Sequence, residues 1–141
     1  MAYISAEFNA EVKVIGIDGL EARLAKGGKA ARAAILKVVG ESAARIHQRT
    51  VDLCPKRTFY MAEHVRTDFS EGGFIFETGW DASDFLGTVD ERGQPRSFYP
   101  FFVEFGTRHM AAQPSLSIAF LEEEPRYKSE LDAALRRALE G

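Results

Sequence analysis

A long periodic stretch between Lys29 and Leu53 constrains the fold of this chain more than any other feature. Apolar or small residues recur there every three or four positions, as they do along one face of an α-helix. Basic residues occupy the other faces, and Pro55 disfavours helical geometry at Cys54. The pattern therefore predicts one long amphipathic helix, against which the other elements must pack. The predicted buried stripe consists of Ala31, Ile35, Val38, Val39, Ser42, Ile46, Thr50 and Leu53.

The residues before this helix show the period of two that is typical of a strand. Apolar and polar side chains alternate from Phe8 to Val14, so residues 3–17 are predicted to form one half-buried strand. Asp18-Gly19 marks a turn, and Asp18 is placed to cap a short helix over residues 20–26. The Gly27-Gly28 pair that follows is expected to break or kink that helix.

After the long helix, residues 59–69 and 73–80 alternate again and are predicted to pair as a hairpin. Gly72-Gly73 supplies the positive φ angles that a tight turn needs. A last helix is predicted from Pro114 through Leu121 and onward, with a kink or restart at Pro125. The chain is therefore predicted to be α+β, with a small antiparallel sheet (the N-terminal strand plus the hairpin) packed on the long helix. Its length of 141 residues predicts one domain, residues 1–141.

Residues 81–97 follow neither period and are predicted to form a long extended loop. A stretch of this length without regular structure is usually functional or disordered. It carries Phe85 and Leu86, which a plain solvent loop seldom displays together.

The next segment, residues 98–107, gathers five aromatic side chains around the single carboxylate of Glu104. It is predicted to form a short helix that is apolar on nearly all sides and must therefore be buried, ended by a left-handed Gly106. A buried carboxylate is costly unless it is hydrogen-bonded or paired. Glu104 is therefore expected to meet backbone N–H groups, Arg108 or a neighbouring subunit.

Residues that commonly carry chemistry are present, but their spacing predicts neither a metal site nor catalysis. His47, His64, His109 and Cys54 do not fall at metal-ligand spacing. No nucleophile elbow, phosphate loop or dinucleotide fingerprint appears. A nuclease would need acidic residues clustered beside a histidine, and the spacing here does not supply them. The three consecutive glutamates at residues 122–124 are interpreted as a solvated face. We expect no cofactor, no metal and no enzymatic activity.

Charge is distributed unevenly along the chain. Residues 21–57 contain nine Lys or Arg and three acids, which gives +6, whereas residues 63–91 contain eight acids and one Arg, which gives -7. Such halves suit head-to-tail packing of copies, or they are two solvated surfaces that never meet. The basic helix could also face DNA, with Arg45 and Arg49 lining a channel. Specific base reading is not expected, because no aromatic residues stand among these cations.

Composition sets the expected compartment. One cysteine rules out an internal disulfide framework, and no apolar run approaches the roughly 20 residues that cross a bilayer. With no secretory leader in the sequence, we expect a protein of the bacterial cytoplasm, or of a particle assembled there, without a membrane partner.

Several segments together carry a resemblance. They are the strand and turn at residues 14–20, a long helix closing on Leu53-Cys54-Pro55, a two-stranded ribbon, the segment Val103-Glu104-Phe105-Gly106-Thr107, and a Pro114-led last helix. In this order they resemble the neck or tail-completion proteins of long-tailed bacteriophages, a family that includes head–tail joining proteins and relatives of minor tail protein Z. The chain departs from that pattern at Thr58-Phe59-Tyr60-Met61, at Pro114-Ser115-Leu116 and in its long loop.

The resemblance implies a structural virion protein that forms a homo-oligomeric ring, hexameric or twelve-fold, at the head–tail junction. Its implied partners are a head-completion or connector protein and a tail terminator or tail tube protein, with DNA passing close by. Residues 81–98 would be an assembly arm that orders against a neighbouring ring, or else a floppy insertion. The residues expected at subunit and ring contacts are Phe85, Leu86, Val89, Tyr99, Phe102, Glu104, Phe105, Gly106, Thr107 and Arg108.

One alternative stays open for the aromatic segment and another for the whole chain. Phe102 and Phe105 could pack in the core of the monomer even if the chain joins heads to tails. The chain could instead be a small cytoplasmic protein-binding module with no virion role, using the same α+β scaffold and exposed loop.

Overall fold

The computed structural model describes residues 3–7, 11–15 and 20–140, with side chains over residues 28–138. The elements in chain order are β1 (Tyr3–Glu7), β2 (Glu11–Ile15), α1 (Leu20–Leu53), α2 (Tyr60–Glu63), β3 (Arg66–Ser70), η1 (Glu71–Gly73), β4 (Ile75–Gly79), η2 (Ala82–Asp84), α3 (Pro100–Phe105) and α4 (Leu116–Glu140).

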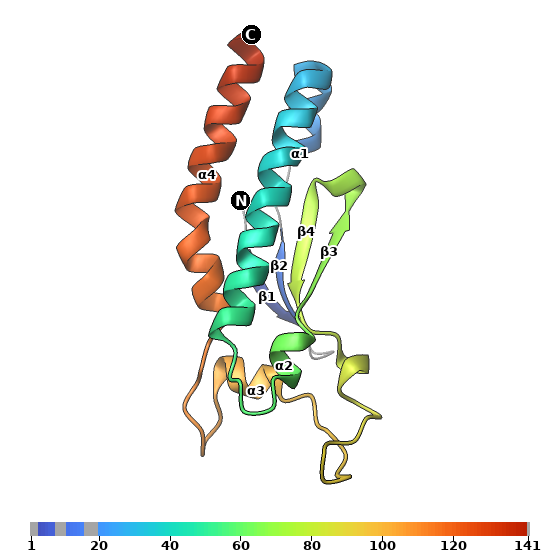
Figure 1. Cartoon of the computed structure of the whole chain (residues 1–141). Coiled ribbons are helices and arrows are strands. Elements are labelled where there is room, and N and C mark those ends of the chain that lie inside the picture. The colour runs from blue at the N-terminus through green and yellow to red at the C-terminus, as the bar shows by residue number, and fades with distance from the viewer. Residues whose placement is uncertain (1–2, 8–10, 16–19, 141) are drawn as a thin grey trace.

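The two long helices form an antiparallel pair. α4 runs alongside α1, and the strands lie on the other side of α1 (Figure 1). The short helices α2 and α3 lie at one end of this pair. We call that end, consisting of α2, α3 and residues 106–115, the base of the molecule. The predicted α+β class is confirmed.

The strands form two antiparallel ribbons that lie against each other through β2 and β4. β1 and β2 pair from Tyr3↔Ile15 to Glu7↔Glu11, so the single strand predicted over residues 3–17 is wrong. The alternation of apolar and polar residues was misleading because it continues in step through both strands of the hairpin. The pattern therefore does not show where the chain reverses direction. Phe8 and the predicted Asp18 cap lie outside the described residues.

The long helix is confirmed, including its break. Gly28 has φ 75° and ψ -175°, which no helical residue adopts, and regular helix follows from there to Leu53. Most of the predicted stripe is buried; Leu53, at the helix end, is half-buried. The polar member Thr50 stays buried because its hydroxyl donates to the carbonyl of Ile46 at 2.7 Å.

The predicted hairpin is shorter than expected. β3 begins only at Arg66, because Tyr60–Glu63 form a helical turn instead of a strand. Met61 and Ala62 are both buried. Adjacent residues of a strand point to opposite faces, so a strand covered on one face could not bury both. At the turn, Gly72 and Gly73 have φ 70° and 97°, as predicted.

The core lies between α1, β4 and the inner face of α4. Its largest fully buried side chains include Phe74, Phe76, Ile35 and Leu116. Trp80 joins the core to the base, because its indole N–H donates to the carbonyl of Met61 at 2.9 Å.

The loop after β4 is long, as predicted, but it folds on itself. The amide of Asp90 donates to the carbonyl of Gln94 at 2.8 Å, and the amide of Arg96 donates to that of Thr88 at 3.0 Å. These bonds flank a bridge between Val89 and Pro95. Within this single chain, the segment is therefore shaped by its own hydrogen bonds.

α4 is one helix that begins at Leu116 and runs through Pro125 without the predicted restart. Its buried positions Phe120, Tyr127, Leu131 and Ala134 belong to the core. Among the helices described, none combines the length and apolar character needed to span a bilayer.

Candidate assembly surface at the base

The aromatic segment forms α3, which begins with Pro100 and ends before Gly106. Gly106 has φ 78° and ψ 172°, so the predicted positive φ is present, although the residue is extended and not in the left-handed helical region. A Cβ at this position would lie 2.9 Å from the Ala112 nitrogen and 3.1 Å from the Met110 carbonyl oxygen. Both φ and the close backbone approach require glycine here.

Glu104 is the anchor of the base. Its side chain is 2% exposed and accepts hydrogen bonds from the amides of Ser115 (3.0 Å), Leu116 (3.3 Å) and Ser117 (2.7 Å). The Ser117 hydroxyl also donates to it, at 2.7 Å. Of the three expected kinds of partner, backbone N–H groups are the ones found, whereas Arg108 lies exposed and is not among the partners.

These contacts place a carboxylate at the N-terminus of α4. The first amides of a helix have no intrahelical acceptor, and the helix dipole favours negative charge there. A side chain 11 to 13 residues earlier in the chain therefore caps α4. The amide of Gln113 also donates to the Val103 carbonyl at 2.7 Å, so α3 and the start of α4 are held as one unit.

The end of α1 meets the same junction. The Cys54 thiol is buried and lies 3.7 Å from the Ser115 hydroxyl, which itself lies 3.4 Å from Glu104. Burial raises the pKa of the Cys54 thiol, so this sulfur stays protonated and acts as a weak donor. Cys54 is thus a packed structural residue of the junction.

Phe102 and Phe105 point away from this anchor. They are 45% and 46% exposed, so the prediction that the helix is buried on all sides is wrong, as is the alternative that both rings pack in the monomer core. At 3.6 residues per turn, the position opposite Glu104 is Phe102. Because the hydrogen bonds fix Glu104 toward α4, the opposite face turns outward.

The remaining predicted contact residues divide between core and surface. Phe85 is fully buried, with edge-on contacts to Tyr60, Phe98 and Tyr99 at 5.1–5.4 Å between ring centroids. Its assignment to an interface is therefore wrong for this conformation, and Tyr99 is half-buried against it. Besides Phe102 and Phe105, the exposed members of the predicted set are Leu86, Val89, Thr107 and Arg108.

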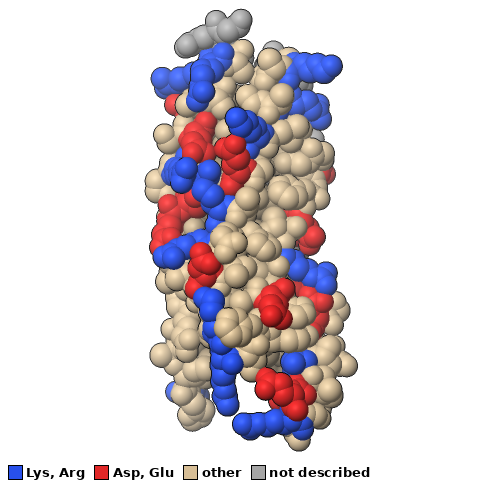
Figure 2. Space-filling view, viewed as in Figure 1, with Lys and Arg blue, Asp and Glu red and all other residues tan. Residues whose placement is uncertain are grey.

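Arg45 and Arg49 are engaged within the chain. Arg45 donates to Glu123 and Glu130, each at 2.8 Å, and Arg49 donates to Glu122 at 2.8 and 3.1 Å. The hydrogen bond to Arg49 lowers the pKa of Glu122, so the pair is charged at neutral pH. Basic and acidic side chains accordingly alternate along the α1–α4 side of the surface (Figure 2).

The acidic run of α4 is only partly the solvated face that was predicted. Glu123 is buried and accepts from the Ser42 hydroxyl at 3.1 Å as well as from Arg45. Glu123 is a contact between helices, and of the three acids only Glu122 is exposed. The sequence did not show this because the acids on α4 and the bases on α1 lie more than 70 residues apart.

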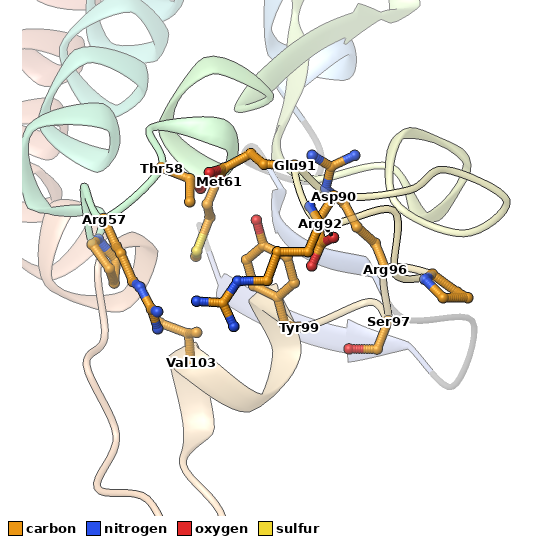
Figure 3. A pocket seen from close by; sticks show the side chains of 12 residues that line it. Arg57, Thr58, Met61, Asp90, Glu91, Arg92, Arg96, Ser97, Tyr99 and Val103 are labelled. Atoms are coloured by element: carbon orange, nitrogen blue, oxygen red, sulfur yellow. Dashed lines mark hydrogen bonds between the residues drawn. The ribbon is translucent and has the colours of Figure 1, made fainter.

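A pocket of about 430 Å³ opens beside α3, and no sequence pattern indicates it. Its floor includes Met61, Tyr99 and Val103, and the guanidinium groups of Arg57 and Arg92 point toward it (Figure 3). Both arginines belong to turns, where no periodicity reports which residues come together.

A third arginine at this pocket is already occupied. The Arg96 guanidinium lies 3.7 Å from the centroid of the Tyr60 ring and donates to the Thr88 hydroxyl at 3.3 Å. It therefore holds the loop against α2.

Over residues 3–7, 11–15 and 20–140, no group of three or more His, Cys, Asp or Glu side chains is placed to hold a metal ion. Comparison of the chain with models of protein families, with curated proteins and with solved structures gave no match.

Proposed function

We propose that this chain is a structural protein of a long-tailed phage or phage-derived particle, forming a ring in the neck that completes the tail end and joins it to the head around the DNA channel. One observation carries the proposal. In the segment Val103–Thr107, which resembles the neck family, Glu104 and Gly106 hold the base together, while Phe105 and its neighbour Phe102 are displayed to solvent.

Exposed aromatic side chains one helical turn apart are suited to a protein contact. Apolar patches on a soluble protein commonly mark interaction sites, and aromatic residues are enriched where partners meet. The α3 helix that bears them is held by main-chain contacts, so the rings are presented on a rigid element. Leu86 and Val89, 53% and 57% exposed on the loop, offer a second apolar contact to an adjacent ring.

We expect DNA to pass this protein without binding to it tightly. Arg45 and Arg49 are neutralised by acids of α4, so a channel wall formed by this face would carry paired charges. Tight binding of a DNA duplex needs unpaired Lys and Arg side chains that contact its phosphates, and a wall of paired charges offers few such side chains. This arrangement supports non-specific proximity to DNA.

A closed ring on the tail axis predicts the copy number. A ring with n-fold symmetry contains n subunits. For a hexameric or twelve-fold ring we therefore expect roughly six or twelve copies in each particle. Quantitative mass spectrometry of purified particles, scaled to the major capsid protein, measures this number. Absence from clean particles, with the chain abundant in the cell lysate, would contradict the proposal and favour the cytoplasmic binding module.

A second experiment tests the surface itself. Particles are produced without the native protein and supplied with the Phe102→Ser/Phe105→Ser variant. We expect the variant to fold, because both side chains are half-exposed, and we expect separate heads and tails to accumulate. Leu121→Ser, which alters an exposed apolar residue on α4, is the control and should support joining. Joined, infective particles from the double variant would contradict the role of α3.

A further inference from the structure

Two surface features have no part in the α3 contact: the pocket bounded by Arg57 and Arg92, and the acidic segment Asp68–Glu71, which comprises the end of β3 and the first residue of its turn. We propose that the Asp68–Glu71 segment of one copy docks into the Arg57–Arg92 pocket of the next copy. This inference deepens the proposed ring, and rests on it, by naming the lateral contact between its subunits.

The pocket is built to receive a carboxylate next to an apolar group. Among the side chains described, none forms an ion pair or hydrogen bond with the guanidinium of Arg57 or Arg92. A guanidinium binds a carboxylate through two parallel hydrogen bonds. The floor beneath them is Met61, Tyr99 and Val103, which suits a ring or an aliphatic chain.

The same pocket is poorly suited to nucleic acid. Asp90 and Glu91 also line it, so the positive charge is confined to Arg57 and Arg92 and does not form the continuous basic track that a phosphate backbone needs. Asp90 is fixed in place because the amides of Arg92 and Gln94 both donate to its carboxylate at 2.9 Å. The Gln94 amide contributes most to lowering the pKa of Asp90, so the acid is charged at neutral pH. A partner with a localised carboxylate and an apolar side chain fits better.

The end of β3 and the start of its turn carry those groups. Phe69 is 52% exposed and lies between Asp68 and Glu71, which are both exposed, and neither carboxylate forms an ion pair with a described side chain. Of the described strands, β3 pairs only with β4, so its outer edge is open. The segment thus presents an exposed aromatic ring and two exposed carboxylates, the kinds of group that the pocket can bind.

The two features cannot meet within one copy. The far end of the segment, at Glu71 beside Gly72 and Gly73, lies near Arg32 and Leu36 of α1, whereas the pocket begins at Pro55, beyond the end of that helix. About 20 residues at 1.5 Å each separate them by roughly 30 Å. A contact between two different patches is heterologous, and such contacts close into rings when the rotation allows.

Charge reversal tests the contact. The pocket variant is Arg57→Glu/Arg92→Glu, and the segment variant is Asp68→Lys/Glu71→Lys. Sedimentation over a concentration series should show the wild-type mass rising above 15.7 kDa and each variant associating at least about tenfold more weakly. A 1:1 mixture of the two variants should regain association, because the acidic segment of one meets the basic pocket of the other.

Several outcomes overturn the inference. Variants that associate as the wild type does, a mixture that does not regain association, or a wild-type chain that stays monomeric throughout would each do so. Loss of duplex DNA binding in the pocket variant, with self-association unchanged, would assign the pocket to phosphate instead. Lys29→Glu/Lys37→Glu, with the same change of net charge on exposed positions of α1, is the control and should associate normally.

The result is separable from the proposed neck role. Should the contact fail while mass spectrometry still finds about six or twelve copies per particle, the ring stands and its lateral contact lies elsewhere. If the contact holds but particles lack the chain, the chain self-assembles outside a virion.

Discussion

The base of the molecule and the α1–α4 pair use carboxylates in different ways. At the base, one buried carboxylate, Glu104, accepts main-chain hydrogen bonds from the first turn of α4. Along the helix pair, Glu122, Glu123 and Glu130 meet arginine side chains that are partly or largely exposed. A buried acceptor with several donors fixes a geometry, whereas an exposed ion pair contributes little to stability.

This difference explains where the exposed aromatic residues are found. Displaying Phe102 and Phe105 to solvent requires a helix that does not rotate to bury them, and Glu104 prevents that rotation. The helix pair has no such constraint, and its surface is covered by alternating charges (Figure 2). We therefore expect substitutions at the base to have larger effects than substitutions along the pair.

The largest effect is expected for Glu104→Ala. It leaves three buried or partly buried amides without an acceptor and removes the cap of α4, so the free energy of unfolding should fall by about 3 kcal/mol. Urea denaturation measures the change. Glu104→Gln, which keeps one acceptor oxygen, should lie between the variant and the wild type. A loss no larger than that of an ordinary surface substitution would show that the base is not anchored in this way.

Gly106→Ala should come next. An alanine at φ 78° is strained, and its Cβ would lie within 3 Å of the Ala112 nitrogen, so the expected loss is about 2 kcal/mol. Gly40→Ala in α1 is the matched control, because a Cβ there meets nothing within 4 Å. That control should gain about 0.5–1 kcal/mol from helix propensity. Equal effects at the two glycines would refute the role given to the close approach.

Along the helix pair, Arg45→Gln should cost about 1 kcal/mol, because it leaves the buried Glu123 with only the Ser42 hydroxyl. Arg49→Gln removes an exposed pair and should leave the denaturation midpoint unchanged within error. The two variants are best measured side by side at low and high salt. If Arg49→Gln is the more damaging, burial is not what distinguishes the two pairs.

A small gain in stability is expected at Tyr127, whose buried hydroxyl meets no hydrogen-bond partner among the residues that the structure describes. Tyr127→Phe should raise the free energy of unfolding by roughly 0.5 kcal/mol at neutral pH. Burial raises the pKa of Tyr127 from 10.0 to about 12.

The pH dependence follows from this shift. The unfolded chain loses the phenolic proton first, so the contribution of the group is fully present below pH 10 and is lost as pH rises toward 12. The wild type should therefore lose more stability than Tyr127→Phe over that interval. Parallel alkaline denaturation curves would contradict the shift.

The sequence predicted correctly those elements whose periodic pattern extends over many residues. The stripe from Ala31 to Thr50 spans several turns, so tertiary packing could not mask it, and the break at Gly28 follows from glycine chemistry. Short elements were harder, because four residues such as Tyr60–Glu63 fit a strand or a helical turn equally well.

The candidate site was predicted only in part. The need of Glu104 for donors followed from its apolar neighbours, but which donors, and hence which face of α3 turns outward, depended on where α4 begins. Phe85 illustrates the limit. An aromatic residue in a loop can be displayed or buried, and the contacts that bury it come from residues before and after it in the chain.

The capping of α4 by a residue of α3 has a consequence for hydrogen exchange. In most helices the first-turn amides exchange quickly with solvent, because nothing in the helix accepts their hydrogen bonds. Here the amides of Ser115, Leu116 and Ser117 are protected only while Glu104 is docked. Their exchange rates therefore report how often the junction opens, independently of global unfolding.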